Sequence, residues 1–338
     1  MRRRVLRTGP VSLLIRPRVI GYLLAATVVL AALTVVSIGA GDFPIPPRRV
    51  LDVLGGTGTA AERLIIGLRV PRTLLAVVVG AALGLAGAVV QRTARNDLAS
   101  PDLLGVTGGA GVGAVTVIVL ADTTGQGAIA VAATLGALVA AAAMLGILRH
   151  TGIGGSTPIL VGIGVSTLLS GIVAWLLTAA DVNDLARAQI WLTGSLNLRS
   201  TGELIAVTAV LAVATVALVP LSSRLAALSL GTDVARALGV PVKGLGLALL
   251  LICVLLTAAT TAAAGPIAFV SLVAPHLARM ATGTPAAGLL TSAVTGATLL
   301  LAGDLIARTA FVVQLPTGAV TALIGAPFLI WLLVRART

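Results

Sequence analysis

The 338 residues carry a formal net charge of +12, are 58% hydrophobic and only 10% charged, and have a mean hydropathy of +1.11. Soluble domains have roughly 25% charged residues, so this composition excludes a soluble protein. Apolar runs that continue for about 20 residues favour membrane-spanning helices over barrel strands, which alternate over roughly 10 residues.

The positive charge does not indicate nucleic-acid binding, because the basic residues flank apolar runs instead of gathering with aromatics on one face. The only lysine, Lys243, lies in VPVKG. The chain therefore lacks the Gly-Lys-[Ser/Thr] of a P-loop and is not a P-loop ATPase by itself. The only cysteine, Cys253, excludes an internal disulfide and a thiolate metal cluster, and we expect it to be a small core residue. No metal site and no cofactor are predicted.

The chain opens with a basic tail, residues 1–18, and a first apolar run that is too long for a signal-peptide core of roughly 7 to 15 residues. We interpret that run as an uncleaved first span and residues 19–338 as one transmembrane domain. The sequence predicts an all-α bundle of about ten transmembrane helices. The expected spans are 19–39, 73–90, 103–120, 127–148, 158–179, 203–221, 244–263, 266–280, 286–306 and 316–334.

An even number of spans places both termini on one side of the membrane. With the termini inside, the internal segments hold 15 of the 23 basic residues. The positive-inside rule therefore predicts cytoplasmic termini.

The external loop over residues 41–72 breaks this trend, because it holds five of the eight external arginines. One interpretation is that these side chains reach lipid phosphates. The other is a docking surface for an acidic soluble partner, since guanidinium groups pair bidentately with carboxylates. The candidates closest to span ends are Arg69, Arg72 and Arg308.

The segment 91–115, QRTARNDLASPDLLGVTGGAGVGAV, separates the second and third spans. We expect Pro101 to begin the third helix and Ser100 to cap it. Glycines allow helices to approach closely in lipid. The candidate pathway or packing glycines are Gly80, Gly84, Gly87, Gly105, Gly108 and Gly109.

Three acidic residues and one histidine are also candidates. Asp181 and Asp184 form a DxxD that a membrane prenyltransferase would use for magnesium-diphosphate, but a solvated loop is the simpler interpretation. His276 is expected to hydrogen-bond within the bundle. Asp304 is expected to pair with Arg308 at i,i+4, although an ionisable group at membrane depth is also a functional candidate.

The loop 222–243 between the sixth and seventh spans contains LSLGTDVARALGV. Thr232 or Asp233 is expected to cap a helix of under two turns that ends at Gly239. Such a helix is too short to span a membrane and, from its residues alone, is expected to lie on the headgroups.

Several motifs in order along the chain carry a resemblance to a known family. They are RVPRTLLAVVVGAALGLAGAVVQRTARNDLASPDLLGVTGGAGVGAV (69–115), WLTGSL (191–196), LSLGTDVARALGV (228–240), GPIAFVSLVAPHLAR (265–279), LLLAGDLIAR (299–308) and LPTGAVTALIGAPFLIWLL (315–333). From about residue 45 to the C-terminus the chain resembles the FecCD/BtuC-type permeases, the membrane subunits of ABC importers for iron-siderophore complexes, haem and vitamin B12. One departure is Asp97, which stands where the family usually has proline, and we expect it to cap the turn locally.

The resemblance implies a type II ABC importer permease in the cytoplasmic membrane of a bacterium, with no enzymatic chemistry of its own. It also implies cytoplasmic ATP-binding subunits, an extracytoplasmic substrate-binding protein and a second permease chain as partners, besides membrane lipids. Its coupling helix would contact the ATPase through Leu230, Gly231, Thr232, Asp233, Ala235 and Gly239.

The expected cargo is an iron-siderophore complex, and WLTGSLN resembles catecholate-siderophore permeases somewhat more than the vitamin B12 type. Haem and vitamin B12 remain alternatives. An ion-driven secondary transporter is a further alternative, and it would place a coupling carboxylate at mid-membrane.

Overall fold

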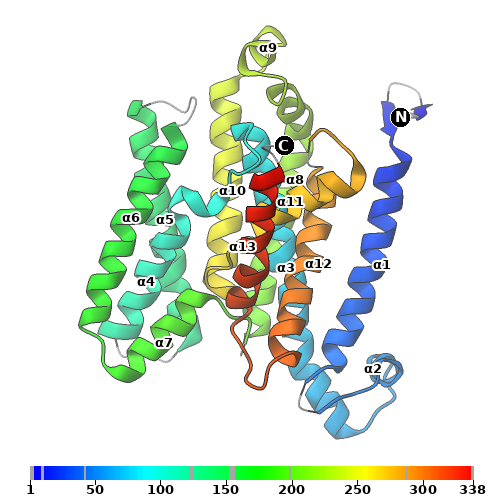
Figure 1. The fold of residues 1–338 in the computed structure, drawn as a ribbon, viewed down its shortest axis with the longest axis vertical. Helices are drawn as coiled ribbons and strands as arrows, with labels where there is room; N and C mark the ends of the chain where they lie inside the picture. Colours follow the sequence, from blue (N-terminus) through cyan, green and yellow to red (C-terminus); the bar gives the residue numbers. More distant parts are fainter. Residues whose placement is uncertain are drawn as a thin grey trace.

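The computed structural model describes residues 4–8, 11–41, 43–121, 125–151, 157–197, 199–286 and 288–335, and over these it is a helical bundle (Figure 1). The helices are α1 (Pro17–Gly39), α2 (Pro47–Leu54), α3 (Ala60–Ala94), α4 (Val106–Leu120), α5 (Gln126–Thr151), α6 (Thr157–Thr178), α7 (Val182–Thr193), α8 (Thr201–Leu228), α9 (Thr232–Ala237), α10 (Val242–Ala264), α11 (Val270–Thr282), α12 (Leu289–Thr309) and α13 (Thr317–Arg335). A 3₁₀ turn, η1 (Pro101–Leu104), precedes α4, and β1 (Arg4–Thr8) pairs antiparallel with β2 (Val11–Ile15).

Seven of these helices are long and apolar enough to cross a membrane: α1, α3, α5, α6, α8, α10 and α12. The other three predicted spans correspond to α4, α11 and α13. Apolar lengths of 15 residues in α4 and 13 residues in α11 fall short of a full crossing, which takes about 20 residues. The apolar part of α13 is also short. The bundle thus combines full spans with partial ones.

The predicted basic tail folds back on itself instead of running straight into the first span. Its two strands form a hairpin in which Arg4 lies opposite Ile15. Residues 1–3 and 9–10 of the predicted tail lie outside the described residues.

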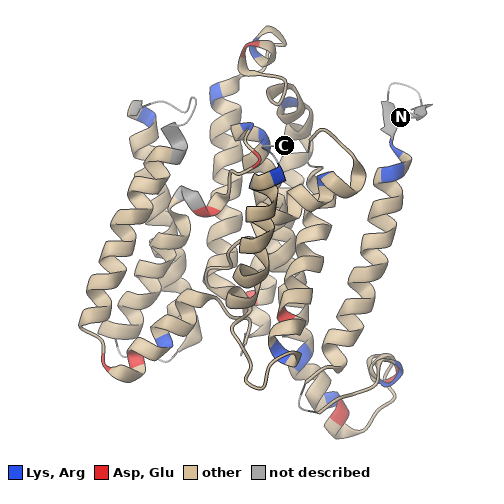
Figure 2. Cartoon of the chain, in the orientation of Figure 1, with Lys and Arg blue, Asp and Glu red and all other residues tan. Residues whose placement is uncertain are grey.

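The two ends of the bundle are distinct. Both termini and α9 lie at one end, whereas α2 and α7 lie at the other (Figure 1). Charged residues gather toward these ends, with few between them (Figure 2). By the positive-inside orientation, the end with α9 is cytoplasmic and the end with α2 and α7 is external.

Helix α3 occupies the centre of the bundle and packs against α8, α10, α11 and α12. Its crossing with α12 is close because small residues face each other. A Cβ atom added at Gly84 would lie 2.2 Å from the backbone oxygen of Ser292, and one at Gly80 would lie 2.4 Å from that of Gly296. Backbone meets backbone here, so even a methyl group forces the helices apart.

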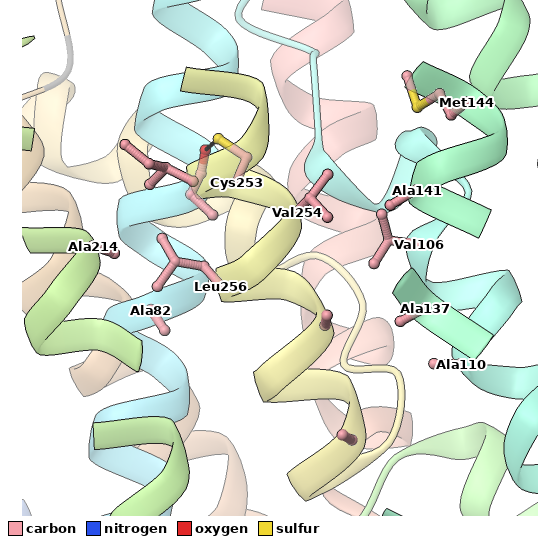
Figure 3. Packing of buried hydrophobic residues seen from close by; sticks show 14 of the residues in the cluster. Ala82, Val106, Ala110, Ala137, Ala141, Met144, Ala214, Cys253, Val254 and Leu256 are labelled. Atoms are coloured by element: carbon pink, nitrogen blue, oxygen red, sulfur yellow. Dashed lines mark hydrogen bonds between the residues drawn. The ribbon is translucent and has the colours of Figure 1, made fainter. Parts of the chain in front are cut away.

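The remaining candidate glycines also lie where neighbouring segments pack closely against them. Gly87 approaches the backbone of Ser271, and Gly109 approaches Gly136 on α5, while Gly108 contacts Leu169 and Gly105 contacts Val165 on α6. The main hydrophobic cluster that surrounds them is rich in alanine and joins α3, α4, α5, α8 and α10 (Figure 3). Cys253 is buried in this cluster as predicted, with its Sγ 3.7 Å from the Ala86 carbonyl.

The segment between α3 and α4 corrects the sequence prediction. Pro101 begins the 3₁₀ turn and α4 starts only at Val106, because Gly105 has a φ of +76° that ends the turn. Ser100 does cap the turn, accepting a hydrogen bond from the Asp102 amide. Asp97 does not cap locally: Asn96 accepts the bond from the Leu98 amide, and Asp97 pairs with Arg279.

Two further predictions change in the second half of the chain. Residues 265–269 are not helical, and α11 starts at Val270 after Phe269, whose φ is +69°. Irregular backbone at membrane depth is tolerated where protein covers it, and the neighbouring Ile267 and Val270 are buried. The DxxD segment is helix α7 and not a loop, with Asp181 accepting the N-cap hydrogen bond from the Asp184 amide at 2.8 Å.

Candidate functional site

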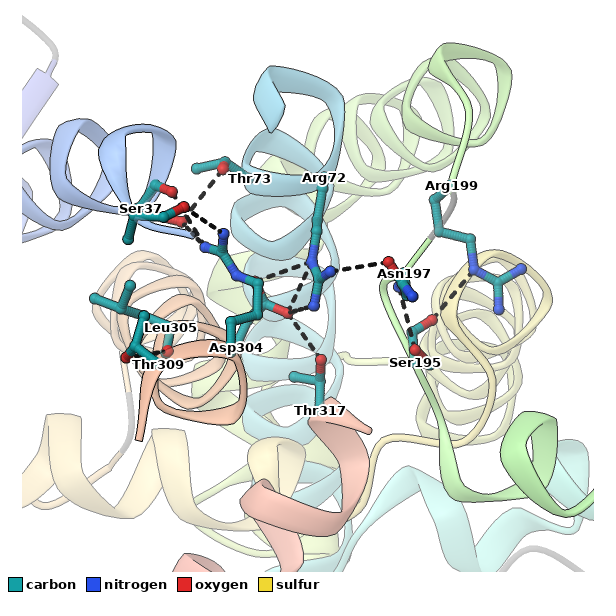
Figure 4. Close-up of polar contacts among 12 residues, drawn as sticks. Ser37, Arg72, Thr73, Ser195, Asn197, Arg199, Asp304, Leu305, Thr309 and Thr317 are labelled. Atoms are coloured by element: carbon teal, nitrogen blue, oxygen red, sulfur yellow. Dashed lines mark hydrogen bonds and ion pairs between the residues drawn. The ribbon is translucent and has the colours of Figure 1, made fainter. Parts of the chain in front are cut away.

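A buried carboxylate lies at the centre of a polar network at the external end of the bundle. Asp304 on α12 is fully buried and accepts hydrogen bonds from Arg72 Nη2 on α3 at 2.9 Å and from the Thr317 hydroxyl on α13 at 2.9 Å (Figure 4). A buried charge requires such partners because it has lost its water. Asp304 therefore joins three helices.

Arg308 extends this network to α1. Its Nε lies 3.0 Å from Asp304 Oδ2 as the predicted i,i+4 ion pair, without the alignment of a hydrogen bond. Its Nη2 donates to the Ser37 hydroxyl at 2.6 Å and its Nη1 to the Ala40 carbonyl at 3.3 Å. The pairing of Arg308 with Asp304 is confirmed, and the contacts with α1 were not visible in the sequence.

Arg69, the third docking candidate, lies at the same end and reaches the segment after α1. It donates to the carbonyls of Ile38, Gly39 and Phe43 at 3.0 to 3.2 Å. The structure therefore brings Arg69, Arg72 and Arg308 to one end, where each bonds to acceptors of its own chain. We refer to these three arginines with Asp304 as the arginine cluster.

The loop after α7 completes this end of the molecule. Asn197 accepts a hydrogen bond from Arg72 Nη1 at 3.1 Å (Figure 4). The Ser195 amide donates to the Ala264 carbonyl at 2.7 Å. The Gly318 amide donates to the Gly194 carbonyl at 3.0 Å. Gly194 also lies against the Pro266 carbonyl, so the segments WLTGSL, GPIAF and LPTG meet in space although they are distant in the sequence.

Arg199 anchors the same loop beside the start of α8. Its Nε donates to the Ser195 carbonyl at 3.2 Å, and its Nη1 lies 3.5 Å from Glu203. Burial lowers the pKa of the Arg199 guanidinium, and the Glu203 carboxylate opposes that shift. Sequence reasoning missed Asn197, Arg199 and Thr317 as members of this network. The only signal for them was their position inside or beside the quoted motifs.

Helix α9 is the second candidate site and stands out from the cytoplasmic end (Figure 1). Its N-cap is Gly231, with a φ of +125° and no side-chain cap, so the predicted capping by Thr232 or Asp233 was wrong. Asp233 instead pairs with Arg236 at 3.0 Å. The helix ends at Ala237, two residues before the predicted end, and Gly239 follows the C-cap Leu238 with a φ of +75°, a conformation that suits glycine after a helix.

The apolar side chains around α9 divide into two sets. Ala235 is fully buried against the bundle, whereas Leu230, Val234 and Leu238 are 69%, 46% and 63% exposed. Val234 lies within α9, whereas Leu230 precedes its N-cap Gly231 and Leu238 is its C-cap residue, so the three exposed side chains belong to α9 and its two ends. We call Leu230, Val234 and Leu238 the α9 face. An apolar face of this kind in water is typical of a protein contact.

His276 and the two aspartates of α7 have structural contacts. His276 Nδ1 lies 2.9 Å from Arg279 Nη2, and its ring packs edge-on against Phe328. Asp184 pairs with Arg187 at 3.2 Å, while Asp181 caps α7. In the described part of the chain, these contacts give each of the three residues a structural role, and no catalytic role is needed to explain them.

The model of the FecCD transport family matches residues 29–335, and this range includes both the arginine cluster and α9. The chain belongs to the FecCD transport family. It is a membrane permease, and the fold of a type II ABC importer permease accommodates its seven full spans and its partial ones.

The relatives of this FecCD-family permease are named for different substrates. The ferric enterobactin transport system permease protein FepG of Escherichia coli is 38% identical over 300 residues, covering 88% of this chain and 90% of that protein. The cobalamin import system permease protein BtuC of Halobacterium salinarum is 36% identical over 280 residues, covering 82% and 75%. Identity alone therefore does not separate iron chelates from cobalamin.

A solved structure shares the architecture of this FecCD-family permease. It is an inward-facing conformation of a metal-chelate type ABC transporter, with a TM-score of 0.81 and 29% identity. The match covers 94% of this chain and 99% of that one. Nearly the whole permease therefore corresponds to one transporter chain.

Proposed function

We propose that this chain is the membrane permease of an ATP-driven importer that carries an iron-siderophore complex into the cell. The observation that carries the proposal is the match to the FecCD transport family over residues 29–335, together with an exposed apolar face on α9. Catecholate carriers are the first candidates because residues 191–197, WLTGSLN, resemble the permeases of that class. Cobalamin is the second candidate, since a relative named for it is 36% identical.

In this proposal, ATPase subunits bind at the cytoplasmic end through α9. Leu230 and its neighbours on the α9 face would enter an apolar groove of the partner, with Gly231, Thr232, Asp233 and Gly239 at the edges of the contact. Ala235 would act from inside, by seating α9 on the bundle. ATP-driven closure of the partner would move α9, and the bundle would switch between outward and inward openings around a pathway shared with a second permease chain.

The external end would receive a substrate-binding protein. Arg72 and Arg308 share one carboxylate, Asp304, so this pair of guanidinium groups keeps a net positive charge. An acidic partner would be attracted to it, and attraction of this kind acts mainly on association rate and register. An ion-driven carrier is less well supported, because Asp304 already bonds to two arginines and a threonine.

Uptake of radioactive iron tests the cargo. Cells that lack the gene and cells in which it is restored would be given iron on catecholate, hydroxamate and citrate carriers, with labelled cobalamin in parallel. Loss and rescue with a catecholate carrier alone is the expected result. Loss and rescue with cobalamin alone would replace the iron assignment.

The α9 face is tested by Leu230→Glu combined with Leu238→Glu. We expect copurification of the ATPase subunit and ATP-dependent uptake to fall about tenfold or more, since the few central residues that dominate an interface contribute about 2 kcal/mol or more each. Thermal stability should stay unchanged because both side chains are exposed. The matched control is Ser223→Glu, an exposed position at the same end but outside α9. Normal ATPase copurification by the double variant would remove α9 from the contact.

The docking role of the arginine cluster is tested by two variants that break the same ion pair but change the charge in opposite directions. Arg72→Gln removes a positive charge, while Asp304→Asn removes the negative one. If docking depends on charge, the folded fraction of Arg72→Gln binds the substrate-binding protein about tenfold more weakly, and that of Asp304→Asn retains binding. Equal losses in both would show that only the local structure matters.

A further inference from the structure

A cavity of about 330 Å³ lies at the cytoplasmic end, between the start of α1 and the rest of the bundle. Its walls come from the first turn of α1, the end of α3, the end of α8 and the loop that joins α11 to α12. Figure 1 shows the upper end of α1 standing beside that loop. We call it the α1 cavity. Its polar lining residues are Arg16, Arg92, Ser229, Thr282, Thr284 and Thr291.

Both charged residues of the α1 cavity are arginines, and no acidic residue is part of its described lining. Within the described chain, neither Arg16 nor Arg92 forms a side-chain hydrogen bond or an ion pair. The Nε atom of Arg92 is buried and has no hydrogen-bond partner. Two half-buried guanidinium groups with no acidic residue in the described lining give the cavity a net positive charge, so this lining favours an anion.

One helix start adds to that preference. Helix α12 starts beside the cavity after Gly288 and lacks a side-chain cap, whereas α1 contributes little because Pro17 has no N–H and the Val19 amide donates to the Arg16 carbonyl. The free N–H groups and the positive dipole end of α12 attract anions. The lining hydroxyls contribute less, because Ser229 donates to the Ala226 carbonyl and Thr291 to the Gly288 carbonyl.

The position of the cavity indicates the source of the anion. Arg16 immediately precedes the first span, so the cavity lies at the level of the lipid headgroups. Val19 and Ala226 give the lining an apolar side as well. At roughly 30 Å³ for one water in the liquid, the cavity has room for about ten waters, or for one glycerophosphate group.

Helix α1 is held at its external end by Arg308 and packs against α12, but its apolar stretch is the least buried among the described full spans. Its apolar segment buries none of its residues in the bundle. The Tyr22 hydroxyl reaches the Thr295 hydroxyl of α12 at 2.7 Å, close to the cavity end. A molecule with an anionic head group and apolar tails would match both the positively charged lining and the exposed apolar side of α1.

We propose that the α1 cavity binds the phosphate group of an anionic phospholipid from the inner leaflet, with Arg16 and Arg92 as its ligands. The bound lipid joins α1 to α3, α8 and the α11–α12 loop. This site is separate from the arginine cluster and does not depend on which chelate the permease carries.

Native mass spectrometry of the full-length permease tests the proposal, with phosphatidylglycerol and phosphatidylcholine supplied in equal amounts. The wild type should retain phosphatidylglycerol preferentially. Arg16→Gln combined with Arg92→Gln should lower that preference by about 25-fold, at about fivefold for each basic residue near a membrane surface. The matched control is Arg18→Gln, because Arg18 is exposed and does not line the cavity. Equal retention by the wild type and the double variant would overturn the proposal.

Two further experiments test the proposal independently of the arginine variants. Ser229→Leu fills the cavity without changing its charge, so it should also lose the lipid even if the arginine variant fails to fold. Excess inorganic phosphate should leave the lipid bound, and displacement by phosphate would overturn the lipid assignment in favour of a free phosphate. Binding of the ATPase subunit that depends on Arg16 and Arg92, with no retained lipid, would overturn it as well.

Discussion

Two pairs of arginines, one at each end of the bundle, differ in their contacts. At the external end, Arg72 and Arg308 bond to Asp304 and to neighbouring segments. At the cytoplasmic end, Arg16 and Arg92 line a cavity without hydrogen bonds to the described chain, and the α9 face is exposed. Arg72 and Arg308 thus have partners in their own chain, whereas Arg16 and Arg92 differ even from cytoplasmic neighbours such as Arg279, which pairs with Asp97.

The largest expected loss of stability comes from Asp304→Asn. A small loss would contradict the conclusion that the external arginines depend on this carboxylate. The substitution keeps the shape but leaves two buried guanidinium groups without their counter-ion. Loss of one partner of a buried ion pair typically destabilises by about 3–5 kcal/mol. The free energy of unfolding in mixed detergent micelles measures it.

The control for Asp304 is Asp233→Asn at the cytoplasmic end, where the ion pair with Arg236 is exposed. Exposed pairs contribute about 0.5 kcal/mol or less, so its unfolding free energy should stay near that of the wild type. Similar values for both variants would mean that the two ends do not differ in this respect.

A second prediction concerns the crossing of α3 and α12, which separates the two ends. Gly84→Ala places a methyl group against the Ser292 carbonyl, and overpacking of this kind costs about 1–3 kcal/mol. Gly67→Ala is the matched control on the same helix, because its added Cβ meets nothing within 4 Å. Unfolding of the two variants in the same micelles measures the difference, and a harmless Gly84→Ala would show that the crossing opens freely.

The smallest expected change in stability comes from the N-caps of α7 and α9, the short helices at the two ends. Asp181 caps α7 through its side chain, so Asp181→Ala should destabilise by about 1 kcal/mol. Helix α9 has no side-chain cap, so Thr232→Ala should change little. Thermal unfolding of the two variants gives the comparison, and a larger loss from Thr232→Ala would contradict the assignment of Gly231 as the cap.

Much of the fold could be predicted from hydropathy, because each apolar run coincides with a helix. The helix breaks were harder to predict, since they fall at Gly105 and Phe269, whose backbones are left-handed, and a left-handed phenylalanine has no sequence signature. The site was predictable only in part. The Arg308 pair with Asp304 follows from helical spacing, whereas Arg72 lies 232 residues away from Asp304 in the sequence. No local pattern reports a contact of that kind.

The sequence alone determined the class of protein and the positions of its long helices, because lipid requires every span to satisfy its own backbone hydrogen bonds. It also carried the motifs that place the chain in its family. Only the tertiary structure decided which polar groups meet. Partners for a buried charge are chosen by the packing of distant helices, and that packing left Asp304 paired and Arg92 open.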